Sequence, residues 1–272
     1  MEAYWDLIKR IIKESDLVLE VLDARLVELS RNEEVENLVE EIGRPLLFVI
    51  NKSDLASKAS LKQQVTELKK RGEVVFINAK KPKDVKVLLY AIKKIFKKYG
   101  KREETVRQFG DPKIKTREAK AEIVAGILGY PNVGKSSIIN AMAHKKKVKV
   151  SKKAGTTHGI HWVKATNEIK LIDSPGVIPL RKDDEVRLGL IGAKTDKIKD
   201  PTLIAHALIK LFLKNNPENF NKFYDIKINE DVDDVVEQIG NKKSYLLKGN
   251  NIDEFRTCSD IIRDWQTGRL RI

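Results

Sequence analysis

The chain has 272 residues, of which 41% are hydrophobic and 34% are charged, with a formal net charge of +14. It is long enough for one large domain and a smaller one, and too apolar for a disordered chain. Its apolar runs are far shorter than the roughly 20 residues of a membrane helix, and the N-terminus lacks a secretory signal. We therefore expect a cytosolic protein without membrane contact. The single cysteine, Cys258, excludes an intrachain disulfide framework and a cysteine-based zinc cluster.

Short β-branched runs bounded by turn residues predict six strands. They cover Leu17–Leu22, Leu46–Ile50, Val74–Ile77, Ile123–Leu128, Trp162–Ala165 and Ile169–Ile172. Segments with apolar residues three and four positions apart lie between these runs and predict helices, at residues 7–12, 35–42 and 88–96. Strands that alternate with helices indicate an α/β fold with a mainly parallel sheet.

The pattern changes twice along the chain. Residues 97–120 are rich in Gly, Pro and charge, which predicts a long surface linker. Beyond residue 183 no strand pattern recurs, and apolar residues at helical spacing predict the buried faces of three helices. These faces comprise Leu203, Ile204, Ala207, Leu208, Leu211 and Phe212, then Val232, Val235, Val236 and Ile239, then Phe255, Cys258, Ile262 and Trp265. We predict one domain over residues 1–182 and a small helical C-terminal domain over residues 183–272.

The positive charge is concentrated in two segments. Residues 93–120 hold eleven Lys and Arg against four acids, and residues 144–153 hold six Lys and no acid. They contribute +7 and +6 of the total of +14, whereas residues 183–272 are close to neutral. Clustered positive charge is typical of a surface that binds nucleic acid. A Lys-rich surface of the heat-adapted type is the alternative, although it explains the total and not the two acid-poor runs.

A phosphate-binding motif follows the fourth predicted strand. Residues 129–136 match GxxxxGK[ST], and residues 137–143 can continue as a helix. Its glycines allow backbone N–H groups to surround phosphates, while Lys135 would reach the β and γ phosphates and Ser136 would bind Mg²⁺. The predicted phosphate contacts are Asn132, Val133, Gly134, Lys135, Ser136 and Ser137.

A base-reading motif follows the second predicted strand, where Asn51, Lys52, Ser53 and Asp54 form NKxD. The carboxylate of Asp54 can accept hydrogen bonds from the ring N–H and the exocyclic amine of guanine, whereas adenine offers no such donor pair. Lys52 would cover the ring with its alkyl chain, and Asn51 would tie this loop to the phosphate loop.

Three further elements complete the predicted site. Asn78, Ala79 and Lys80 follow the third strand and partly match the Ser-Ala-Lys of guanine sites, in which the Ala backbone N–H donates to guanine O6. Residues 173–176 form DxxG, in which Asp173 would hold Mg²⁺ through water and Gly176 would sense the γ-phosphate. Thr157, in preference to Thr156, would be the switch threonine that binds Mg²⁺.

The order of these motifs is unusual. Ordinary GTPases have the phosphate loop, the switch threonine and DxxG before NKxD, whereas here the NKxD and Asn-Ala-Lys elements come first. Such a circular permutation keeps the site intact if the original termini are joined, and residues 97–120 are long enough to join them. The chain therefore resembles the circularly permuted GTPases of the YlqF/YawG type, the ribosome biogenesis GTPase A group. The resemblance spans nearly the whole chain, including residues 23–25, 30–32 and 264–268.

The resemblance implies a GTP-hydrolysing switch in the maturation of the large ribosomal subunit, with Mg²⁺ as cofactor and stimulation by its ribosomal partner. It also implies K⁺ as a possible second cation, to which Asn132 is suited. Val177 stands where Ras-like proteins have a water-positioning glutamine, so we expect slow intrinsic hydrolysis. A Gly-His element that some relatives carry near the N-terminus is missing, since residues 1–15 contain no histidine. His158 and His161 are candidates for positioning the water, and solvated loop histidines are the alternative.

The expected partners are GTP and GDP, and ribosomal RNA or the large subunit bound through residues 93–120 and 144–153. We expect a monomer. Because the segment after Asp173 leads directly into residues 183–272, we expect the nucleotide state to reposition the C-terminal domain. Two alternatives stay open: a guanine-nucleotide-gated RNA-binding module in which hydrolysis is incidental, and a P-loop kinase, which the NKxD motif disfavours.

Overall fold

The computed structural model describes residues 2–101, 123–143, 160–174, 185–191 and 200–272. Within these ranges, no helix has the length and apolar character needed to cross a membrane. The chain divides into two compact units, one of Met1–Ser53 with Leu61–Pro179 and one of Asp54–Ser60 with Leu180–Ile272. The predicted domain boundary after residue 182 and most of the predicted linker lie outside the described residues.

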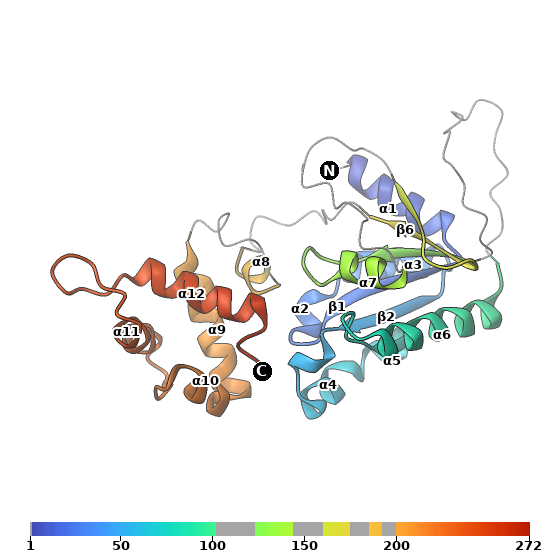
Figure 1. The fold of residues 1–272 in the computed structure, drawn as a ribbon. Coiled ribbons are helices and arrows are strands. Elements are labelled where there is room, and N and C mark those ends of the chain that lie inside the picture. Colours follow the sequence, from blue (N-terminus) through green and yellow to red (C-terminus); the bar gives the residue numbers. More distant parts are fainter. Residues whose placement is uncertain (1, 102–122, 144–159, 175–184, 192–199) are drawn as a thin grey trace. The chain divides into compact units, whose positions relative to one another are not determined.

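Six strands of the first unit form one sheet in the order β3-β2-β1-β4-β6-β5 (Figure 1). The strands are β1 (Leu17–Asp23), β2 (Leu46–Asn51), β3 (Glu73–Phe76), β4 (Ile123–Leu128), β5 (His161–Lys164) and β6 (Ile169–Asp173). All neighbouring strands pair in parallel except β5, which pairs antiparallel with β6 at the edge. The predicted α/β fold is confirmed, and each strand lies within one residue of its predicted ends.

Helices cover both faces of this sheet (Figure 1). Helices α1 (Glu2–Glu14) and α3 (Glu33–Glu41) contact each other and strands β4 and β2, while α6 (Pro82–Tyr99) contacts β1, β3, β4 and α7 (Lys135–Met142). Because β1, β2 and β4 are central and covered twice, every residue in them is buried, which explains their nearly continuous apolar sequences. Shorter elements of the chain are α2 (Val27–Ser30), the 3-10 turn η1 (Ser53–Leu55), α4 (Lys58–Val65) and α5 (Leu68–Arg71).

The second unit is helical in its described part. It contains α8 (Glu185–Ile191), α9 (Pro201–Asn215), α10 (Pro217–Tyr224), α11 (Val232–Lys242) and α12 (Glu254–Thr267). Its core is aromatic: the ring of Phe212 lies 5.3 Å from that of Phe220 and 5.8 Å from that of Trp265, measured between centroids. Asp or Asn side chains accept a backbone N–H at the start of α9, α10, α11 and α12, which explains where these helices begin.

Two residues predicted for buried helix faces are exposed instead. Leu203 is 58% exposed and Phe255 is 61% exposed, although Cys258 and Trp265, on the same predicted face as Phe255, are fully buried. Both residues lie in the first turn of their helix. Apolar spacing alone does not show whether neighbouring helices cover that turn. The buried apolar residues of α12 are Cys258, Ile261, Ile262 and Trp265.

Helix α8 is held by the motif at residues 264–268. The indole Nε1 of Trp265 donates to the carbonyl oxygen of Leu190 at 2.7 Å, and Nε2 of Gln266 donates to that of Gly189 at 3.2 Å. These carbonyl groups lie at the C-terminal end of α8, where a helix leaves its acceptors without partners. Side chains of α12 therefore fix the end of the first described helix after the DxxG motif.

Candidate functional site

The predicted nucleotide-binding elements meet at the carboxyl edge of the sheet. Asp23 at the end of β1 pairs in register with Asn51 at the end of β2, and Ile127 of β4 pairs with Asp173 at the end of β6. The phosphate loop follows β4, and the Asn-Ala-Lys turn follows β3. In open α/β sheets, ligands bind in the crevice outside this edge.

The phosphate loop requires glycine at both of its ends. Gly129 has φ +140°, and a Cβ there would lie 2.5 Å from the carbonyl oxygen of Val21. Gly134 has φ +107°, and a Cβ there would lie 2.1 Å from Nδ2 of Asn51. Gly134 also precedes the first residue of α7, so backbone N–H groups at the helix start are available to an anion.

Lys135 points back into its own loop. Its Nζ donates to the carbonyl oxygen of Tyr130 at 2.8 Å and also to that of Gly129. Burial lowers the pKa of Lys135 to about 8, and the negative charge of Asp173 opposes that shift. The ammonium group is therefore held inside the phosphate loop by carbonyl groups, which phosphate oxygens can replace.

Asn51 connects three loops. Its Nδ2 donates to the carbonyl oxygen of Val133 in the phosphate loop at 2.9 Å, and its Oδ1 accepts the backbone N–H of Ala79 at 3.1 Å. The predicted connection between Asn51 and the phosphate loop is confirmed. The Ala79 N–H, which we predicted to donate to guanine O6, donates to Asn51 here.

Side chains also fix the turn after β3. Oδ1 of Asn78 accepts the backbone N–H of Lys80 at 2.9 Å, and the carboxylate of Asp84 in α6 accepts that of Asn78 at 2.8 Å. An Asn can form such a turn where a guanine site usually has Ser. The partial match to Ser-Ala-Lys is therefore compatible with a well-defined turn.

Lys52 is anchored by a carboxylate from β1. Its Nζ lies 2.6 Å from Oδ2 of Asp23 and donates to the carbonyl oxygen of Asn132 at 2.9 Å. Arg25 donates to both oxygens of Asp23, from Nε at 3.0 Å and from Nη2 at 2.8 Å. The side chain of Lys52 remains 24% exposed, so it can cover a base while its end is held.

The sequence analysis assigned Asp23 no role in the site, and named it only within residues 23–25 of the family resemblance. Burial would raise its pKa, but hydrogen bonds and positive charge from Arg25 and Lys52 outweigh burial and lower it to about 2. The available signal was an acidic residue at the end of a mostly apolar strand, with an arginine two residues later. Such a carboxylate, buried at the ligand edge, needs a cationic partner.

Two described residues offer oxygen ligands on the phosphate side of the site. Ser136 is exposed in the first turn of α7, and Asp173 ends β6. Burial raises the pKa of Asp173, while the charges of Lys135 and His161 oppose that shift. No group of three or more His, Cys, Asp or Glu side chains in the described ranges could hold a metal alone. A hydroxyl and a carboxylate do fit Mg²⁺, which commonly takes one or two protein ligands together with phosphates and water.

The remaining predicted site residues fall in two groups. In the described part of the chain, Ser53 and Asp54 lie in η1, Ser137 is exposed in α7, and His161 is exposed opposite Asp173 in the β5–β6 register. Outside the described residues lie Thr156, Thr157, His158, Gly176, Val177 and the lysines of residues 144–153.

Comparison with known proteins identifies the family. A family model described as 50S ribosome-binding GTPase matches residues 124–248. Ribosome biogenesis GTPase A of Bacillus cereus is 32% identical over 265 residues, which cover 95% of this chain and 85% of that protein. This chain belongs to the ribosome biogenesis GTPase A family. The predicted family and its GTPase class are therefore confirmed.

A second relative has higher identity, and a solved structure has a similar fold. The GTP-binding protein MJ1464 of Methanocaldococcus jannaschii, which is described as uncharacterized, is 38% identical over 268 residues, 97% of this chain. The chain spans 65% of the length of that relative. GDP-bound YlqF from T. maritima covers 97% of this chain with a TM-score of 0.61 and 22% identity, which supports the circularly permuted fold.

The Asp23 cluster leads to a stability prediction. In Asp23→Asn, Lys52 and Arg25 lose a counter-charge, and breaking a buried ion pair costs roughly 3 to 5 kcal/mol. The pH dependence has a defined sign, because folding lowers the pKa of Asp23 from 3.8 to about 2. Its contribution to stability is present above about pH 4 and is lost as the pH falls through about 2.

Urea unfolding of the wild type and Asp23→Asn across that pH range measures both effects. We expect the variant to be about 3 kcal/mol less stable at neutral pH, with a shallower loss of stability on acidification. Asp6→Asn, which changes an exposed carboxylate, is the control. Equal stability and equal acid dependence of the wild type and Asp23→Asn would show that the Asp23 ion pairs do not stabilise the fold.

Proposed function

We propose that this chain is a GTP-driven switch that assists assembly of the large ribosomal subunit. The proposed binding of GTP rests on the position of Asn51. Its hydrogen bonds join the NKxD loop, the Asn-Ala-Lys turn and the phosphate loop. Elements that are far apart and reversed in the sequence thereby form one site. The names of its relatives, which include ribosome biogenesis GTPase A, support the ribosomal part.

Within this proposal, the loops after β2 and β3 bind the guanine and the loop after β4 binds the phosphates. Asp54 accepts from the base, Lys52 covers it, and Asn51 fixes the loops. The base contacts are Asn51, Lys52, Ser53, Asp54, Asn78, Ala79 and Lys80, and the phosphate contacts are Asn132, Val133, Gly134, Lys135, Ser136, Ser137 and Gly176.

We assign the metal to Ser136, Asp173 and Thr157, with Mg²⁺ as the ion. When bound with the nucleotide, Mg²⁺ neutralises charge that develops on the phosphates. The chain's own contribution is the ammonium of Lys135, which the loop already positions, and the carboxylate of Asp173 nearby. Asn132 is the candidate side chain for K⁺.

The sequence after the DxxG motif predicts slow hydrolysis by the chain alone. Val177 follows the DxxG motif and cannot orient water. The described candidate for that task, His161, is exposed at the start of β5. A partner must therefore complete the catalytic arrangement, and residues 144–153 lie in the sequence between the phosphate loop and the switch threonine, where bound RNA would act on both.

GTP turnover with and without purified large ribosomal subunits tests the proposed function. We expect slow basal turnover and at least about tenfold stimulation, since a partner that completes a GTPase site can contribute roughly 10³-fold or more. Small subunits are the matched control, Lys135→Ala is the blank, and a sodium buffer tests whether potassium is required. Tight GTP binding without stimulation would instead support a nucleotide-gated RNA-binding module.

We also propose that the nucleotide state moves the C-terminal helices. The γ-phosphate-sensing motif continues along the chain into α8, and α8 is bonded to Trp265 and Gln266 of α12. Because of these hydrogen bonds, α8 cannot move without also moving α12. This arrangement is an order–disorder or rigid-body switch of the kind that one phosphate can bias.

Limited proteolysis tests the proposed movement. We expect protection of residues 183–272 to differ between the GTP-analogue and GDP forms. In Trp265→Phe, which removes the donor to the Leu190 carbonyl, the difference should shrink. Equal protection in both nucleotide states of the wild type would rule out the coupling.

A further inference from the structure

We infer that the outward face of α6 is a docking surface for the phosphate backbone of RNA, an inference that rests on the proposed ribosomal function. This face is defined by Lys83, Lys86, Val87, Tyr90, Lys94 and Lys97. All six residues belong to the described part of the chain, unlike the lysine run at residues 144–153. Three properties distinguish the face: its spacing, its uncompensated charge and its exposed aromatic ring.

Helical spacing places these six residues in one stripe. They follow one another at intervals of three, one, three, four and three residues, and all six are exposed. The opposite side of α6 carries Val85, Leu88, Ile92 and Ile95, which are buried against the sheet. Lys83 and Lys97 are fourteen residues apart, so the stripe extends about 21 Å along the helix.

The positive charge of the stripe has little compensation. Lys83, Lys86 and Lys97 form no ion pair with any carboxylate in the residues that the structure describes. Lys94 lies 3.9 Å from Glu73, but both side chains are exposed, and such pairs contribute little. Asp84, the only acid of α6, accepts the backbone N–H of Asn78.

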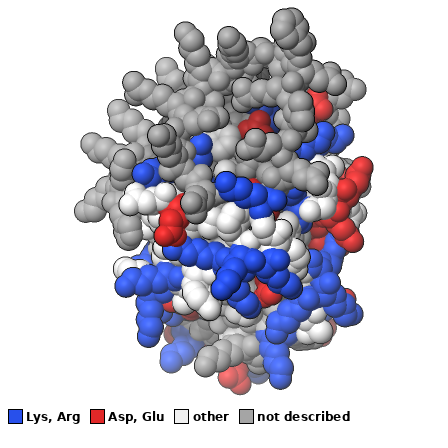
Figure 2. All heavy atoms as spheres, turned by 90° about the vertical axis from the view of Figure 1, so that its right-hand side faces the viewer, with Lys and Arg blue, Asp and Glu red and all other residues white. Residues whose placement is uncertain are grey.

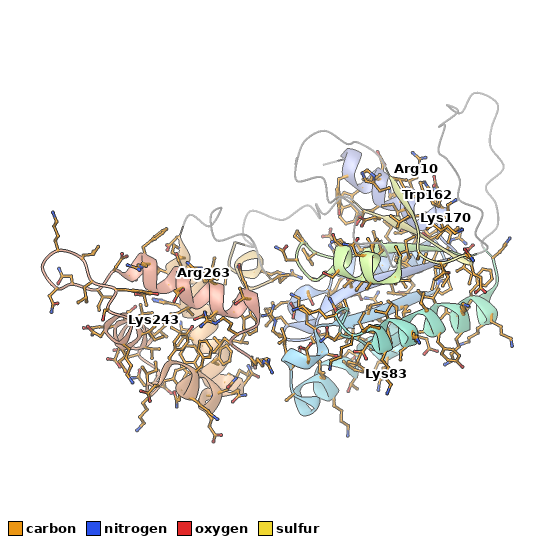
Figure 3. All side chains as sticks on the ribbon, viewed as in Figure 1. Arg10, Lys83, Trp162, Lys170, Lys243 and Arg263 are labelled. Carbon is orange, nitrogen blue, oxygen red and sulfur yellow. The ribbon has the colours of Figure 1, made fainter. Side chains whose placement is uncertain are left out.

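The surface around the C-terminal end of α6 is also basic. Figure 2 faces the side of the molecule on which α6 ends, and Lys and Arg side chains gather there with few acids among them. Lys83 extends from the start of α6 on the side away from the sheet (Figure 3). Because all six side chains of the stripe are exposed, phosphate groups can reach them from the solvent.

Tyr90 distinguishes this stripe from a merely solvated lysine surface. It lies in the middle of the stripe and is 70% exposed, and Val87, one turn before it, is 49% exposed. A tyrosine ring among lysines can pack against a ribose or an unpaired base while the ammonium groups bind phosphates. The combination matches RNA, whose backbone presents charge at regular intervals with apolar faces between.

An acidic protein fits this surface less well. Lysine is depleted in protein–protein interfaces, whose centres are apolar and aromatic, and here a single ring and one valine are surrounded by four lysines. The stripe also begins three residues after Lys80, and Asp84 bonds the turn that contains it. RNA bound to α6 would therefore lie next to an element of the guanine site.

Two triple variants with the same change in charge test the inference. Lys83→Gln, Lys86→Gln and Lys97→Gln together neutralise the stripe. Lys9→Gln, Lys13→Gln and Lys62→Gln together neutralise exposed lysines of α1 and α4 and form the control. Binding is measured to protein-free large-subunit ribosomal RNA and to intact large subunits at several salt concentrations.

We expect the α6 triple variant to bind RNA and subunits roughly 10- to 100-fold more weakly, with the slope of log affinity against log salt reduced by about 2. The control variant should stay within about threefold of the wild type on both measures. Tyr90→Ala should lower affinity about tenfold without changing the salt slope, because a ring contributes contact and not charge. Unchanged affinity of Tyr90→Ala would remove the ring from the docking surface.

Failure of this inference and failure of the proposed function give different results. If the wild type binds subunits and the α6 triple variant binds them equally well, the docking surface is wrong and the ribosomal function stands. If the variant loses binding to subunits but not to RNA, the partner is protein and the inference is overturned. If α6-dependent binding to RNA occurs without binding to subunits, the docking surface stands and the ribosomal function fails.

Discussion

The site depends on one buried amide. Asn51 uses its donor for the carbonyl of Val133 and its acceptor for the N–H of Ala79, so the loops after β2, β3 and β4 have a fixed spacing. Its neighbour Gly134 must be glycine, since any Cβ would occupy the position of the Asn51 amide. Circular permutation is compatible with this arrangement because the constraint acts across the sheet edge and not along the chain. The order of the motifs in the sequence is therefore immaterial to the site.

An ion pair and a hydrogen bond of Lys52 also hold two of these loops in place. Asp23 at the end of β1 holds Lys52, and Lys52 in turn bonds the carbonyl of Asn132 in the phosphate loop. The strand between the two nucleotide-binding halves thus contributes an ion pair that reaches both. Because Lys135 is likewise held by carbonyl groups of its loop, the cationic groups of the site are positioned by the fold itself, which reduces the ordering that nucleotide binding requires.

The sequence was sufficient for most of the fold, for a physical reason. Strands covered on both faces are almost entirely apolar, with Glu20 in β1 as an exception, so the ends of β1, β2 and β4 could be predicted closely. The motifs at the strand ends then located the edge of the sheet that forms the site. Apolar periodicity wrongly predicted that Leu203 and Phe255 are buried. It shows which side of a helix is apolar, but not whether neighbouring elements cover that side as far as the first turn. It also could not reveal Asp23, whose role arises from pairing between strands that are adjacent in the sheet. The outward stripe of α6 was missed because the helix was predicted only over residues 88–96, whereas α6 begins at Pro82 and includes Lys83 and Lys86.

Guanine recognition by the loop after β2, which precedes the phosphate loop in the chain, can be tested most directly. Asp54→Asn changes the base that the site prefers: xanthine carries a carbonyl where guanine has its exocyclic amine, so an amide donor suits xanthine and a carboxylate does not. We predict that Asp54→Asn binds GTP at least about 100-fold more weakly than the wild type does, and binds XTP more tightly. Asp54→Ala should also bind GTP more weakly, but its affinity for XTP should not increase. Equal GTP affinity of Asp54→Asn and the wild type, measured by titration calorimetry, would contradict guanine recognition by Asp54.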